Sequence, residues 1–209
     1  MPTYDVKKER KELYSCRPDE FVEVDVPVMQ FLMVDGHGDP NTAPEYAEAV
    51  EALYTASYGV RALAKQELGR VHTVGPLEGL WSAEDMDTFR TRDKTAWDWT
   101  MMIVQPDWIT AELVEQALAT ARRKKGLAAL DRVRFETFTE GRCVQVLHVG
   151  SYDDEGPTIA RLHDEYLPAH GLALRGRHHE IYLSDPRRVE PARLRTILRQ
   201  PIADRKDGR

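Results

Sequence analysis

The sequence predicts an α+β protein made of two strand–helix–strand–strand modules that share one antiparallel sheet. Segments with the alternation of a strand are followed by bends rich in glycine and aspartate. Each bend precedes a segment with the apolar spacing of an amphipathic helix. This order of elements occurs twice along the 209 residues. We therefore expect a pseudo-twofold arrangement, with the helices on one side of the sheet and a ligand groove on the other.

The first module is predicted over residues 21–130, after a charged arm of residues 1–20. A capping box of Thr42 and Glu45 predicts the start of a helix of about 25 residues. The glycine at position 69 marks its expected end. The strand pattern before this helix runs through a valine-rich segment into a glycine-rich bend.

A strand with a strong aromatic pattern completes the first module. Trp97, Trp99, Met101 and Ile103 share one face of this strand. The pattern leaves two interpretations open for the tryptophans, a core stripe beneath the helices or the wall of a groove. Thr110 is expected to cap the next helix, which ends in a basic run where the helix dipole favours cations.

The second module is predicted over residues 131–202 and is followed by a polar tail of residues 203–209. Its first strand covers residues 143–149. Pro157 suits the first turn of the helix that follows, and Gly171 closes that helix. His148 lies on the first strand and fits either a satisfied, half-buried histidine or a site residue.

Residues 178–186 contain the most informative candidate ligand-binding side chains of the sequence. Because side chains alternate along a strand, His178, Glu180 and Tyr182 lie on one face. A carboxylate beside a phenol suits a flat or cationic organic molecule, although a polar strand face also commonly meets only water. His178 and His179 face opposite ways, so we expect no shared metal.

Composition and charge narrow the possible partners. The chain is 42% hydrophobic and 31% charged, with a net charge of -6 and a pI near 5.7. It lacks the basic surface that nucleic acid and anionic membranes attract, so we expect neither direct DNA binding nor membrane association. No secretory signal or apolar span is evident, which indicates a cytoplasmic protein. Cys16 and Cys143 have no metal or disulfide spacing, and we expect free thiols.

Several segments together resemble a known family. They are residues 179–186, 198–202, 97–107 and 146–152. Over residues 20 to 202 the chain is similar to the stand-alone branch of the GyrI-like small-molecule-binding domains. This module is also the effector-binding half of multidrug-sensing transcription regulators. The resemblance implies a sheet groove lined by aromatic side chains, with one acidic residue at its base, and Glu180 matches that acidic residue.

The resemblance also implies the function and its alternative. Members of the family bind lipophilic cations, and some stand-alone members hydrolyse strained, cyclopropane-bearing, DNA-alkylating natural products. We therefore expect multidrug binding without a cofactor or metal. The alternative is a metal-free hydrolase in which Glu180 acts as general base and Tyr182 as donor. The family name suggests a protein partner such as a gyrase, but no sequence feature identifies one. The expected ligand-binding residues are Glu180, Tyr182, Trp97, Trp99, Trp81, Tyr152, Tyr54 and His148.

Overall fold

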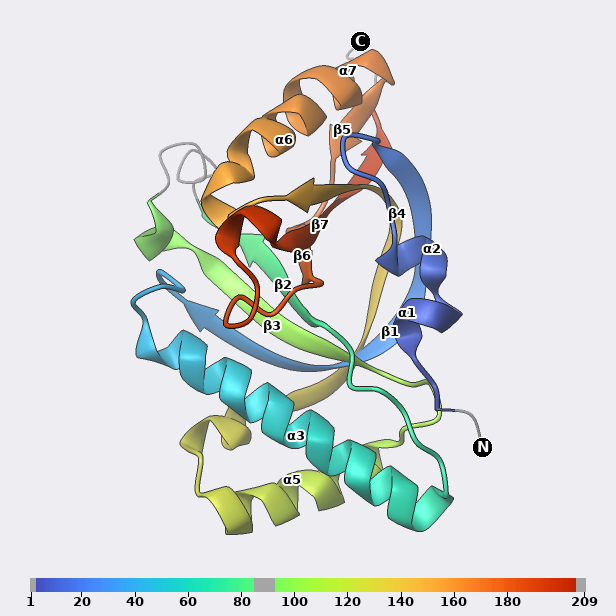
Figure 1. Ribbon diagram of the computed structural model, residues 1–209, viewed down its shortest axis with the longest axis vertical. Coiled ribbons are helices and arrows are strands. Elements are labelled where there is room, and N and C mark those ends of the chain that lie inside the picture. Colours follow the sequence, from blue (N-terminus) through green and yellow to red (C-terminus); the bar gives the residue numbers. More distant parts are fainter. Residues whose placement is uncertain (1–2, 85–92, 206–209) are drawn as a thin grey trace. The chain divides into compact units, whose positions relative to one another are not determined.

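The computed structural model describes residues 3–84 and 93–205 and divides the chain into two compact units. Unit 1 contains Met1–Glu9 and Met29–Phe138, and unit 2 contains Arg10–Val28 and Thr139–Arg209. Figure 1 labels the main helices and strands. In chain order the elements are α1 (Val6–Glu9), α2 (Lys11–Tyr14), β1 (Val22–His37), α3 (Pro44–Leu68), β2 (Leu77–Ser82), η1 (Lys94–Ala96), β3 (Asp98–Gln105), α5 (Ala111–Lys125), η2 (Ala128–Arg132), β4 (Arg134–Val149), η3 (Tyr152–Asp154), α6 (Gly156–Ala160), η4 (Arg161–Tyr166), α7 (Leu167–Ala169), β5 (Leu172–Leu174), β6 (His178–Tyr182), η5 (Pro191–Arg193) and β7 (Arg195–Asp204).

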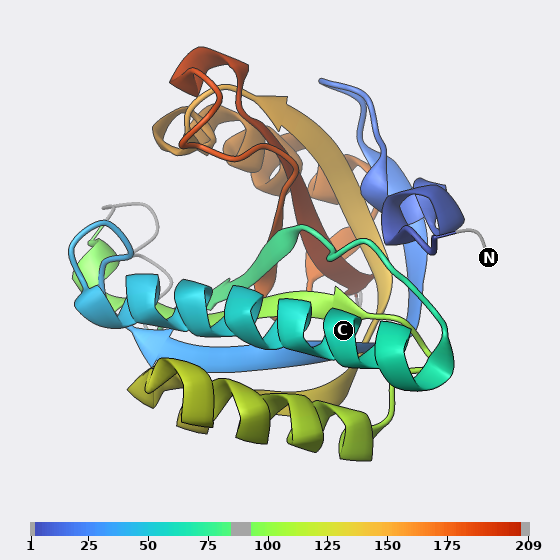
Figure 2. The same cartoon turned by 60° about the horizontal axis from the view of Figure 1, so that its bottom comes forward.

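Unit 1 follows the predicted strand–helix–strand–strand order. Its strands pair antiparallel in the order β1, β3, β2. The helices α3 and α5 contact each other and lie side by side in Figures 1 and 2. The buried stripe of α3 consists mainly of small side chains, which allow a helix to approach its neighbours closely. These buried residues are Ala49, Ala52, Leu53, Ala56, Ser57, Val60 and Ala64.

The ends of the helices in unit 1 test the predicted capping residues. The capping box at Thr42 is wrong, because α3 begins at Pro44 and its N-cap Ala43 makes no side-chain bond. Proline is favoured at the first helical turn, where its missing N–H costs nothing. The predicted end at Gly69 is confirmed, with φ at 62°. Thr110 also caps α5 as predicted, because its side chain accepts from the Leu113 amide.

Unit 2 repeats the strand order of unit 1. Its strands pair antiparallel in the order β4, β7, β6, and the short β5 pairs with the end of β7. The predicted helix is present as a helical segment over residues 156–169. It contains one π-helical turn, η4, in its middle. Leu162 and Leu167 of this segment pack with Val144 of β4, so the segment covers the sheet face on which Val144 lies.

Two strands, β4 and β7, are longer than the sequence predicted. The strand β4 begins at Arg134 rather than near residue 143. The strand β7 ends at Asp204, so two residues assigned to the polar tail belong to the sheet, while residues 206–209 lie outside the described residues. The predicted α+β fold with two strand–helix–strand–strand modules is confirmed.

Candidate functional site

The register of β6 decides which way its polar residues face. Glu180 pairs with Leu198 of β7, and Leu198 pairs with Val146 of β4. Residues that pair across an antiparallel sheet share a face, and so do residues two apart on one strand. Glu180 and Tyr182 therefore share the face of Val144, which the helical segment covers. The expectation that Glu180 lies on the face opposite the helices is not met within unit 2.

The Glu180 carboxylate has two polar neighbours on its own strand, Tyr182 and His178. Its Oε2 atom accepts a hydrogen bond of 2.7 Å from the Tyr182 hydroxyl. Its Oε1 atom lies 3.5 Å from His178 Nε2, and the Glu180 side chain is 15% exposed. The Tyr152 ring of η3 meets the Tyr182 ring edge to face, with centroids 5.5 Å apart. We call Glu180, Tyr182, His178 and Tyr152 the Glu180 cluster.

A second histidine lies close to this cluster. Burial lowers the pKa of His163 of η4, and the nearby His178 lowers it further, while Asp164 opposes the shift. The Nε2 atom of His163 and both ring nitrogens of His178 are buried and have no hydrogen-bond partner among the described residues. Buried polar atoms of this kind are usually satisfied by water or by a ligand.

His148 has a structural role in the bend after β4. Its Nε2 atom lies 3.1 Å from the carbonyl oxygen of Ser151. A Cβ atom at Gly150 would lie 2.9 Å from the same nitrogen, and the φ angle of Gly150 is 151°. The geometry therefore supports the interpretation of His148 as a satisfied, buried histidine.

The tryptophan on β3 lies in the core of unit 1. The Trp99 side chain is buried, with 1% exposure, and its Nε1 atom donates to the Gly38 carbonyl at 3.2 Å. Its ring covers Gly36, where a Cβ atom would lie 2.0 Å from the ring carbon Cη2. It also meets Tyr46 of α3 edge to face, at 5.3 Å. These contacts place Trp99 on the helix side of the sheet as a core residue, the first of the two open interpretations.

The other aromatic candidates of unit 1 form two groups. Trp81 is buried and stacks on Tyr46, with centroids 6.4 Å apart. Trp97 is half-buried and meets Trp81 edge to face at 5.7 Å. Tyr54 is half-buried on α3 and stacks on the exposed Tyr58. Ligand contacts by Trp81, Trp97 and Tyr54 stay predictions.

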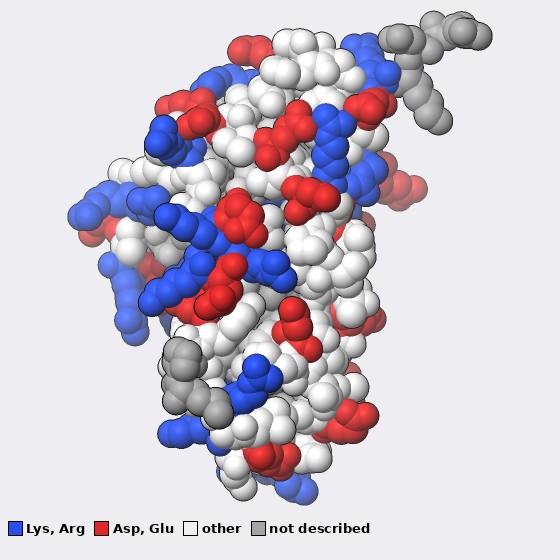
Figure 3. Space-filling model, turned by 90° about the vertical axis from the view of Figure 1, so that its right-hand side faces the viewer, with Lys and Arg blue, Asp and Glu red and all other residues white. Residues whose placement is uncertain are grey.

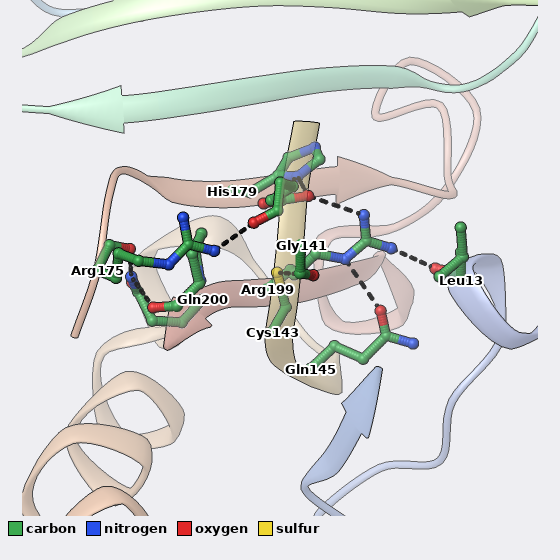
Figure 4. A network of polar contacts seen from close by, with 10 residues as sticks. Leu13, Gly141, Cys143, Gln145, Arg175, His179, Arg199 and Gln200 are labelled. Atoms are coloured by element: carbon green, nitrogen blue, oxygen red, sulfur yellow. Dashed lines mark hydrogen bonds and ion pairs between the residues drawn. The ribbon is translucent and has the colours of Figure 1, made fainter. Parts of the chain in front are cut away.

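Sequence reasoning missed a buried ionic network on the other face of unit 2 (Figure 4). His179 Nδ1 lies 3.0 Å and 3.1 Å from the two carboxylate oxygens of Glu140. Arg199 donates to Glu140 at 3.3 Å and to the Gln145 side chain at 3.1 Å. A third bond of 2.6 Å joins Arg199 to the Leu13 carbonyl at the end of α2. The usable signal in the sequence was a charged residue, Arg199, directly after the apolar pair Ile197 and Leu198 of a predicted strand.

The charged and polar neighbours of Glu140 favour the ionised form of its carboxyl group. Burial raises the pKa of Glu140, but the contacts with His179 and Arg199 outweigh burial and lower the pKa to about 2. Arg175 also donates to the backbone carbonyl of Glu140. A buried charge is tolerated only when it is paired in this way.

Three further observations concern the surface charge, membrane-spanning helices and metal-binding groups of the described residues. On the face shown in Figure 3, positive and negative side chains are interspersed. Among the helices in the described ranges, none is both long and apolar enough to cross a membrane. Within residues 3–84 and 93–205, no group of three or more His, Cys, Asp or Glu side chains is placed to hold a metal ion.

The fold is that of a domain that binds small molecules. The model of the GyrI-like small molecule binding domain matches residues 19–203. The chain belongs to this family. No curated protein sequence matches the chain.

Solved structures with a similar fold include three proteins of Listeria innocua. An uncharacterised conserved protein is 40% identical with a TM-score of 0.88, over 96% of this chain and 100% of that chain. A hydrolase is 37% identical with a TM-score of 0.84 over the same shares. A second hydrolase is 38% identical with a TM-score of 0.86, over 97% of this chain and 100% of that chain.

Proposed function

We propose that the protein binds lipophilic, aromatic, cationic small molecules at the Glu180 cluster. The observation that carries this proposal is a carboxylate with 15% exposure whose two neighbours within its strand are a phenol and a histidine. A largely dehydrated carboxylate gains free energy when a cation approaches it. An organic cation can supply that charge and displace ordered water.

Aromatic rings beside the carboxylate favour flat ligands over small inorganic cations. Tyr152 and Tyr182 lie edge to face at 5.5 Å. A cation over such a ring gains about 0.5 to 2 kcal/mol. Ring faces and one negative charge specify little about the rest of the ligand, so this site should accept several unrelated compounds.

Titration with rhodamine 6G, a fluorescent lipophilic cation, tests this proposal. A charge-assisted contact contributes about 1.5 to 3 kcal/mol, so Glu180→Gln should weaken binding roughly tenfold to hundredfold. The matched control is Glu190→Gln, which removes the same charge from an exposed position of unit 2 and should leave affinity unchanged. Equal binding by the wild type and Glu180→Gln would exclude this carboxylate as the cation site.

A second candidate function is hydrolysis of strained electrophiles, because the two Listeria relatives of 37% and 38% identity are hydrolases. Glu180 would accept a proton from water while the water oxygen bonds to a cyclopropane carbon. The strained C–C bond breaks, and its electron pair moves into a conjugated carbonyl group, which then takes up a proton. Because the Tyr182 hydroxyl donates to Glu180, its role in this step is to orient the base.

Mass spectrometry of a recovered substrate separates binding from hydrolysis. The probe is an aromatic compound with a cyclopropane conjugated to a carbonyl, and the product of hydrolysis is heavier by one water. Turnover should be absent in Glu180→Gln and retained in Glu190→Gln. Recovery of unchanged compound from the wild type would leave binding as the function, and equal turnover in Glu180→Gln would exclude Glu180 as the base.

A further inference from the structure

The strand that carries Glu180 has an unusual pattern, because it is polar on both faces. His178, Glu180 and Tyr182 share one face, while His179 and Ile181 share the other. A one-residue slip in pairing turns every side chain of a strand to the opposite face. In most half-buried strands an apolar face prevents such a slip, but here the apolar pattern alone specifies the register weakly.

The buried network of Glu140, His179 and Arg199 adds contacts that can specify the register of β6. His179 pairs with Arg199 in the β6–β7 register, and Arg199 pairs with Gln145 in the β4–β7 register. These three side chains thus form one row across three strands, and Glu140 joins the row at both His179 and Arg199. The side chains of His179 and Glu140 are 1% and 2% exposed, and that of Arg199 is 2% exposed.

The network disfavours both neighbouring registers. A slip of β6 by one residue in either direction would turn Glu180 to the face that already holds the Glu140 carboxylate. Two buried carboxylates would then share the single Arg199 guanidinium, and like charges at close range repel strongly in a buried site. The same slip would remove Ile181, which is fully buried, from its present face.

We propose that the network of Glu140, His179 and Arg199 fixes the register of β6 and so holds Glu180 and Tyr182 in the ligand site. Glu140 and His179 are therefore positioning residues, and their effect on ligands passes through Glu180. This inference rests on the proposed function only for its binding readout. A buried polar group that specifies a register is a known role of such groups in other proteins.

The direct test is to determine the register of β6 in Glu140→Gln. Nuclear Overhauser contacts between the β6 and β7 strands report that register. The wild type should show contacts of Glu180 with Leu198 and of His179 with Arg199. We expect these contacts to weaken in Glu140→Gln and a shifted or mixed set to appear. A wild-type set of cross-strand contacts in Glu140→Gln would overturn the proposal, whether or not any ligand binds.

Binding of rhodamine 6G gives the second readout. Glu140→Gln should lose affinity by a factor close to that of Glu180→Gln, and the double variant should lose no more than Glu180→Gln alone. Leu172→Ala, in the apolar cluster of unit 2, controls for a general loss of stability and should bind as the wild type does. Losses that add in the double variant would show that Glu140 acts independently of Glu180 and would contradict the inference.

A conservative pair keeps the test sharp if Glu140→Gln folds poorly. His179→Gln retains an N–H donor toward Glu140 and should preserve the register and most of the affinity, whereas His179→Leu should lose both. Equal affinity and register in these two variants would overturn the proposal. Failure of the proposed function has a different signature, which is wild-type affinity in Glu180→Gln.

Discussion

Units 1 and 2 share a strand order but are stabilised in different ways. Unit 1 packs one unbroken helix of 25 residues over its sheet and fills the layer between them with aromatic rings. Unit 2 packs a helical segment interrupted by a π turn and buries the ion network of Glu140, His179 and Arg199. The comparison teaches that one topology tolerates either an apolar or an ionic interior.

The two kinds of interior also contribute differently to the stability of the fold and to the choice of a single strand register. Apolar packing stabilises without fixing a unique register where both faces of a strand are polar. A buried ion pair adds little net stability compared with apolar side chains, but it penalises every arrangement that leaves a charge unpaired. Unit 2 places its ionic network directly behind the strand of the Glu180 cluster, where a fixed register matters most.

The largest effect should come from removing the carboxylate of the network. Glu140→Leu leaves the buried Arg199 guanidinium without its counter-charge, which typically costs about 3 to 5 kcal/mol. Urea unfolding at pH 7 measures the loss. A triple variant with leucine at positions 140, 179 and 199 should recover much of it, and a triple variant as unstable as Glu140→Leu would contradict this interpretation.

Acid should weaken unit 2 through the same carboxylate. The pKa of Glu140 is about 2 in the fold, against an ordinary value of 4.5. Because the folded pKa is lower, the contribution is complete above about pH 4.5 and is lost as the pH falls toward 2. The loss is on the order of 3 kcal/mol. Unfolding measured across this range should show the slope in the wild type, and an equal slope in Glu140→Gln would assign it to other groups.

A smaller effect is expected in the aromatic layer of unit 1. Gly36→Ala places a methyl group where the Trp99 ring lies, since the Cβ atom would be 2.0 Å from that ring. Overpacking of this kind costs about 1 to 3 kcal/mol. Thermal unfolding measures the cost, which should shrink in a Trp99→Leu background. An unchanged cost in that background would mean that the ring is not the obstacle.

A second pH effect is expected at His72, a buried histidine of unit 1. Burial, together with a smaller contribution from the positive charge of Arg61, lowers its pKa from 6.5 to about 4. The unfolded chain therefore binds a proton that the folded chain does not, and stability should decline as the pH falls from about 6.5 to about 4. His72→Phe keeps an aromatic contact with Trp108 and should remove this decline. Persistence of the decline in His72→Phe would exclude His72 as its source.

The elements with strong local signals were predicted well from the sequence. The helix stop at Gly69 and the cap at Thr110 depend on a few neighbouring residues, and both are present. The Thr42 cap was predicted wrongly, because Pro44 supplied a competing start signal. Local chemistry therefore specified these two helix ends.

The candidate site was harder to predict, because faces and partners depend on register. Alternation placed Glu180 and Tyr182 on one face, but it could not show that the helical segment covers that face. The Glu140–His179 contact joins residues 39 positions apart, and no local sequence pattern predicts a contact over that separation. Trp99 was ambiguous for the same reason, since a stripe of apolar residues does not reveal which layer lies against it.

A crystal structure of the protein with bound rhodamine 6G would test the central claim most directly. Our account predicts the dye beside the Glu180 carboxylate, in contact with the Tyr152 or Tyr182 ring, and β6 in the register described here. Dye bound at a place that touches none of the Glu180 cluster would contradict the account.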